Sequence, residues 1–113
     1  MEEKNKLWKV RTVKNYPEAH NHIFFGEVLQ TLNPYLKMRC RTFHFGKNIN
    51  GPKDIRSGKL GTRIIPWSRI EIVNEISGEF DFADSRLVFE EGRVFLSDGR
   101  LKYTLASSYD NRY

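Results

Sequence analysis

Apolar and charged residues alternate along YLKMRCRTFHF, residues 35–45, and this period of two restricts the segment to extended structure. A strand there carries three apolar side chains on one face and three basic ones on the other, namely Leu36, Met38 and Cys40 against Lys37, Arg39 and Arg41. HIFFGEVLQTL, residues 22–32, is equally typical of a strand, and Asn33-Pro34 has turn chemistry. We therefore expect a long hairpin, with Gly26 marking a sharp bend or bulge.

Further strands are predicted on both sides of this hairpin. Residues 7–13 alternate weakly and are predicted as a strand, with a helix as the alternative. IIPWSRIEIV is apolar and β-branched, but proline cannot donate a hydrogen bond in the middle of a sheet. We expect two short strands, 62–65 and 69–76, joined by a corner at Pro66-Trp67-Ser68. Residues 46–61 are basic, lack apolar periodicity and are predicted as a long mobile loop.

The C-terminal third repeats a short apolar pattern, RLVFE, RVFLS and RLKYTLA, after a linker at residues 77–85. Asp98-Gly99 is a strong hairpin signal, and Glu91-Gly92 is a weaker one. These signals predict a three-stranded meander. No segment shows a helical period with caps, so the fold class is predicted as all-β.

Length and composition favour one domain. The 113 residues, 13% of them aromatic, are enough for one modest core. Residues 1–6 and 107–113 are polar and are expected to be flexible tails. Cys40 is the only cysteine, which excludes an internal disulfide, and no run of about 20 apolar residues is present. We expect a soluble cytoplasmic protein without a membrane partner.

Charge is divided unevenly along the chain. Residues 37–69 hold nine basic residues and one acid, whereas residues 70–99 hold eight acids and two basic residues. This division predicts either a surface that faces a polyanion or head-to-tail self-association of unlike surfaces. Ordinary surface charge that maintains solubility is the alternative.

No residue pattern predicts an enzyme or a cofactor. His20, His22 and His44 lack a further ligand at zinc-like spacing, so we expect no metal. Cys40 lies on the apolar face of its strand, where an inert buried thiol is expected, and Ser68 has no nucleophile-elbow context. The acidic turn residues match no calcium loop and no catalytic pair. No catalytic residue is therefore assigned.

Aromatic residues near cations indicate a nucleic-acid interface instead. Tyr35 and Trp67 each lie at a predicted turn, where a ring can stack on a base, and the basic row on residues 37–41 can neutralise phosphates. Core packing of both rings and a solvated strand face are the alternatives. The predicted nucleic-acid-binding residues are Asn33, Tyr35, Lys37, Arg39, Arg41, Arg63, Trp67 and Arg69.

The order of these segments resembles the Sm and Sm-like RNA-binding family over about residues 7–76. The resemblance rests on a glycine-led strand (GEVLQT), a turn, a second long strand (YLKMRCRTF), a variable loop and two short strands joined by a tight corner. Gly26, Asn33 and Tyr35 stand at family motif positions. The resemblance implies a strongly bent, five-stranded Sm-like small barrel, ring assembly by edge-strand pairing, and binding of RNA or single-stranded nucleic acid. Residues 77–106 then form an added meander on the same domain.

A second function is also open. Leu36 and the corner Ile65-Pro66-Trp67-Ser68 stand where the family carries the polar residues of its nucleotide pocket. An oligomeric structural or protein-interaction barrel that has lost this pocket is the alternative.

Overall fold

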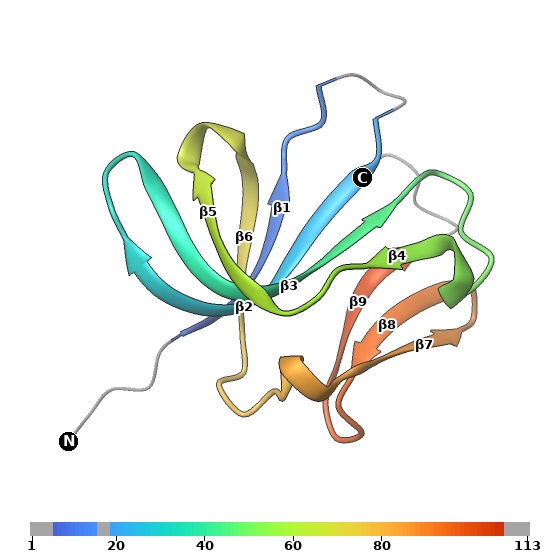
Figure 1. Ribbon diagram of the computed structural model, residues 1–113. Helices are drawn as coiled ribbons and strands as arrows, with labels where there is room; N and C mark the ends of the chain where they lie inside the picture. The colour runs from blue at the N-terminus through green and yellow to red at the C-terminus, as the bar shows by residue number, and fades with distance from the viewer. Residues whose placement is uncertain (1–5, 16–18, 108–113) are drawn as a thin grey trace.

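The computed structural model describes residues 6–15 and 19–107, and within them the chain is all-β, with nine antiparallel strands and no α-helix (Figure 1). Residues 1–5 and 108–113 of the expected tails lie outside the described residues. No described helix is long and apolar enough to cross a membrane. The nine strands, and the lack of an α-helix among the described residues, confirm the all-β prediction.

The first sheet holds six strands: β1 (Leu7–Thr12), β2 (Asn21–Thr31), β3 (Tyr35–Phe45), β4 (Ile55–Ser57), β5 (Gly61–Pro66) and β6 (Ile70–Ile76). Its order is β4-β3-β2-β1-β6, and β5 also pairs with β3. The long strand β3 therefore has two partners along one side, because residues 35–40 pair with β5 and residues 43–45 pair with β4. The predicted hairpin of β2 and β3 is present.

The corner in IIPWSRIEIV lies where the proline predicts it. β5 ends at Pro66, a short 3-10 turn covers Trp67–Arg69, and β6 begins at Ile70. The missing N–H of Pro66 thus falls at the end of a strand that, among the described residues, pairs on one side only.

The expected closure into a barrel is wrong. Within the described residues β5 pairs with β3, β6 pairs with β1, and no ladder joins β5 to β6, so the sheet stays open. The hairpin bulge lies between Val28 and Gln30 and not at Gly26. Gly26 is buried instead at a point where β3 passes close by. Glycine is needed there because a Cβ would collide with the carbonyl oxygen of Arg39.

The segment predicted as a long loop is partly regular structure. A 3-10 turn (Pro52–Asp54) and the short strand β4 lie within it. Ile49 and Ile55 are buried in the core, which fixes the segment against the first sheet. Only two isolated apolar residues carry this attachment, so the sequence shows no period there.

The predicted C-terminal meander is a second sheet of β7 (Arg86–Glu90), β8 (Arg93–Ser97) and β9 (Lys102–Ser107), in that order. Its first turn places Glu91 and Gly92 at positive φ, and its second places Gly99 at φ 94°. The carboxylate of Asp98 accepts hydrogen bonds from the backbone N–H groups of Asp81, Arg100 and Leu101. These bonds lower the pKa of Asp98 to about 2.

Two apolar clusters cover opposite faces of the first sheet. The inter-sheet cluster lies between strands β1, β2 and β3 of the first sheet and the strands of the second sheet. It includes Ile23, Phe25, Phe43, Val94, Leu96 and Leu105. The other cluster holds Val10, Phe24, Leu36, Met38, Cys40 and Ile65, with Trp67 packed against it. Alternation along β2 and β3 produces this division, since neighbouring residues face opposite sides. Both clusters thus depend on one hairpin.

Candidate nucleic-acid interface

The β2–β3 turn and the β5–β6 corner lie side by side at one end of the first sheet (Figure 1). The indole Nε1 of Trp67 donates to the carbonyl oxygen of Leu32 at 2.6 Å, and its backbone N–H donates to Pro34 at 3.4 Å. Tyr35 lies opposite Pro66 in the β3–β5 ladder. We call residues 32–35 and 66–69 the turn-and-corner end. It brings together Asn33, Tyr35, Trp67 and Arg69 of the predicted site.

Trp67 holds the two turns of this end together by packing and by a hydrogen bond. Its ring is half-buried against the Leu36 and Met38 cluster, and its N–H is satisfied by Leu32. Asn33 and Arg69 are exposed, and Tyr35 is half-buried. The exposed polar groups of this end therefore come from the turn, Ser68 and Arg69.

The basic row on β3 divides into cations with different surroundings. Lys37 is half-buried beside Ile64, its neighbour on β5. Arg39 is exposed, pairs with Glu27 at 3.9 Å and lies 6.0 Å from the ring of Phe82. Exposed ion pairs of this length are weak, so a polyanion can compete for Arg39.

Arg41 and Arg63 are occupied by acceptors of their own chain. The Arg41 guanidinium donates to the carbonyl oxygens of Ser85 at 2.7 Å and Phe82 at 3.3 Å, which fixes the linker to β3. Arg63 donates to the carbonyl oxygen of Cys40 at 3.0 Å and to two carbonyls of residues 59–61. Of the predicted cations, Lys37, Arg39 and Arg69 remain for a ligand.

A histidine pair lies at the other end of β3. His22 and His44 face each other across the β2–β3 ladder, with ring centroids 3.8 Å apart. Burial, then His44, then Arg63 and Arg69, lower the pKa of His22 to about 4, so its ring is neutral at pH 7. Its buried Nε2 has no hydrogen-bond partner within the described residues. The described histidines, cysteines and acids form no group that could hold a metal ion.

This pairing was not predicted from the sequence, although a signal for it exists. The Asn33-Pro34 turn alone would place His22 opposite Phe45, next to His44, and the bulge between Val28 and Gln30 shifts the register by one residue so that His22 faces His44. From the sequence, the histidines were considered only as possible metal ligands, no metal was expected, and the hairpin register was not applied.

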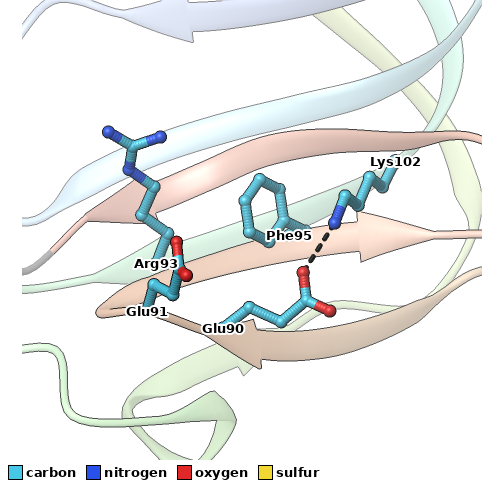
Figure 2. A pocket seen from close by; sticks show the side chains of 5 residues that line it. All are labelled: Glu90, Glu91, Arg93, Phe95 and Lys102. Atoms are coloured by element: carbon cyan, nitrogen blue, oxygen red, sulfur yellow. Dashed lines mark hydrogen bonds and ion pairs between the residues drawn. The ribbon is translucent and has the colours of Figure 1, made fainter.

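Three surface hollows differ in charge. One of about 620 Å³ on the second sheet is lined by Glu90, Glu91, Arg93, Phe95 and Lys102 (Figure 2). Its charges cancel, and Lys102 Nζ lies 2.6 Å from Glu90 and 4.7 Å from the Phe95 ring centroid. A second, of about 350 Å³, holds Asp84, Asp98 and Arg86 and is net acidic.

The third hollow, also of about 350 Å³, is net basic and lies where β3 meets β4. Its side chains include His20, His44, Lys53, Asp54 and Arg56. We call it the histidine hollow. None of its residues belongs to the predicted nucleic-acid site.

Comparisons with protein-family models, with curated proteins and with solved structures gave no significant match for this chain. The Sm-like resemblance therefore stays a prediction.

Proposed function

We propose that this protein is a non-catalytic, self-associating Sm-like β module of the cytoplasm that binds RNA or single-stranded nucleic acid at the turn-and-corner end. The observation that carries the proposal is the hydrogen bond from Trp67 to Leu32, which holds the two turns together. Asn33 is exposed in the β2–β3 turn, Arg69 is exposed at the corner, and Tyr35, Lys37 and Arg39 lie on one face of β3.

Each group has a distinct task in this binding. The Tyr35 ring stacks on a base, a contact worth about 1–3 kcal/mol. Lys37, Arg39 and Arg69 neutralise backbone phosphates and release counterions. Three cations give modest affinity with a slope of log K against log salt of about −2, since each single-strand phosphate contributes about −0.7.

Fluorescence polarisation of a short labelled single-stranded RNA across a salt series tests this site. Arg69→Gln should make the slope shallower by about 0.7. Arg93→Gln, which changes an exposed cation of the mixed-charge hollow on β8, is the matched control and should leave the slope unchanged. Absence of binding at low salt would reject the nucleic-acid function.

Self-association is proposed through two of the edge strands, β5 and β6. Among the described residues β5 and β6 each pair on one side only, and they expose Ile64 and Ile72 by 59% and 44%. Lys59 lies just before β5, whereas Glu71 and Glu75 lie on β6, so the two edges differ in charge. Pairing β5 of one copy with β6 of the next continues the sheet and covers both isoleucines.

Light scattering tests the assembly. Ile64→Lys and Ile72→Lys should each lower the molar mass to that of a monomer, because either change places a charge at the paired edge. Phe89→Ser, which removes an apolar side chain that is 40% exposed on β7, is the control. A monomeric parent protein, or an unchanged mass in both edge variants, contradicts edge pairing.

A second candidate function is a structural assembly module without a nucleotide pocket. It is favoured by one observation, namely that Trp67, Arg41 and Arg63 all direct their polar groups to carbonyl oxygens of their own chain. An oligomer that binds no RNA at low salt would support this candidate over the first.

A further inference from the structure

The histidine hollow lies at the end of β3 remote from the turn-and-corner end. β3 supplies His44, β4 supplies Arg56, and the 3-10 turn before β4 supplies Lys53. His44 and Arg56 are direct neighbours in the β3–β4 ladder. His20, just before β2, completes the wall. Four cationic or protonatable groups from separate segments thus surround one space.

Negative charge in this hollow is scarce. Lys53 and Arg56 are exposed, and neither forms an ion pair within the described residues. Asp54 is the one acid among the lining residues described, and its Oδ2 accepts from the backbone N–H of Asn50 at 2.7 Å. Burial, then Arg56 and His20, lower the pKa of His44. The positive field is therefore only partly offset by the protein itself.

An unsatisfied polar atom belongs to a neighbour of the lining residue His44. The His22 ring contacts the His44 ring, and His22 Nε2 is buried without a hydrogen-bond partner among the described residues. Such atoms are uncommon in folded proteins. The two other hollows differ, because one is neutral and one is acidic.

We propose that the histidine hollow binds a phosphate group. Arg56 is placed to form a forked pair with two phosphate oxygens, while Lys53 supplies a point charge and His44 a ring N–H. A volume of about 350 Å³ holds a phosphate together with part of the group that carries it. The site goes beyond the proposed function, which uses the opposite end of β3. A free phosphate and the terminal phosphate of a nucleic acid present the same chemistry here.

Amide NMR of the whole chain, titrated with inorganic phosphate against chloride at equal ionic strength, tests the site. Saturable shifts at His44, Lys53 and Arg56 are expected with phosphate only. Arg56→Gln should weaken binding by about tenfold or more, because a charged hydrogen bond is lost. Arg93→Gln should bind as the parent does. Shifts equal to those in chloride, or unaltered binding by Arg56→Gln, overturn the proposal.

Two oligonucleotides identify the source of the phosphate. A 5′-phosphorylated dinucleotide that binds this hollow at least about tenfold more tightly than inorganic phosphate assigns a nucleic-acid end. Equal affinity assigns a free phosphate, and both results support the site. If an RNA without a terminal phosphate shifts the amide signals of Asn33 and Tyr35, while inorganic phosphate leaves the signal of His44 unchanged, the proposed function is supported and this inference is overturned. The reverse result retains the hollow and rejects RNA binding.

Discussion

Trp67 on the β5–β6 corner donates its indole N–H to Leu32 in the β2–β3 turn, and this bond joins segments 35 residues apart. The ring also packs against the cluster that contains Leu36 and Met38. One side chain thus holds the corner by packing and by a hydrogen bond.

Replacing Trp67 separates these two contributions. Trp67→Ala should lower the free energy of unfolding by about 3 kcal/mol, the low end for such truncations because the ring is half-buried. Trp67→Phe retains a ring but loses the hydrogen bond, and should cost about 1 kcal/mol. Urea unfolding measures both. Equal stability of the Ala variant and the parent would show that the ring does not hold the corner.

Arg41 should hold the linker between the sheets. Arg41→Met removes the bonds to the Ser85 and Phe82 carbonyls and should cost about 2 kcal/mol, with faster proteolysis within residues 77–85. Arg93→Met on β8 is the control, since that side chain is exposed and lies on a strand of the second sheet. Similar cleavage of both variants would contradict the assigned role.

Gly26 should tolerate no side chain. A Cβ there collides with the backbone of Arg39 and Cys40, so Gly26→Ala should destabilise the fold by about 1–3 kcal/mol or more. Gly78→Ala is the matched control, because its Cβ meets no atom within 4 Å. Thermal unfolding of the two variants compares them, and equal melting temperatures would exclude the close approach.

Acid should weaken the fold through His22. Its pKa is about 4 in the folded chain against an ordinary value of 6.5, so between these values the unfolded chain binds a proton that the folded chain does not. The contribution is complete above pH 6.5 and is lost as pH falls towards 4. Urea midpoints across this range should decrease for the parent and decrease less for His22→Gln. His20→Gln, at an exposed position, should retain the parent's decrease.

Much of the fold could be predicted from the sequence because local rules decide it. The alternation of apolar and charged residues predicted β3. The missing backbone N–H of Pro66 predicted the corner, and Asp98-Gly99 predicted the last turn. The closed barrel failed because β5 pairs with β3 and β6 pairs with β1, and the residues carry no signal for whether these two consecutive strands also pair with each other. β4 was missed because three residues are too few to show a period.

The candidate site was less accessible from the sequence. Turn chemistry predicted that Asn33, Tyr35 and Trp67 lie at turns, but it did not predict the hydrogen bond from Trp67 to Leu32 that brings the two turns together. Whether an arginine is exposed or bonded to carbonyls depends on the packed linker, so Arg41 and Arg63 could not be distinguished from Arg39. The histidine hollow draws on three segments whose proximity requires the β3–β4 ladder.

Strand β3, paired along both sides, also sets a distance. Its ends carry Tyr35 and Phe45, so ten steps of about 3.3 Å place them at most about 33 Å apart, and less where the strand bends. Hydrogen-bonded neighbours prevent this separation from stretching. A polyanion that contacts both ends at once must therefore be long enough to span this fixed distance. A shorter oligomer can bind at one end only.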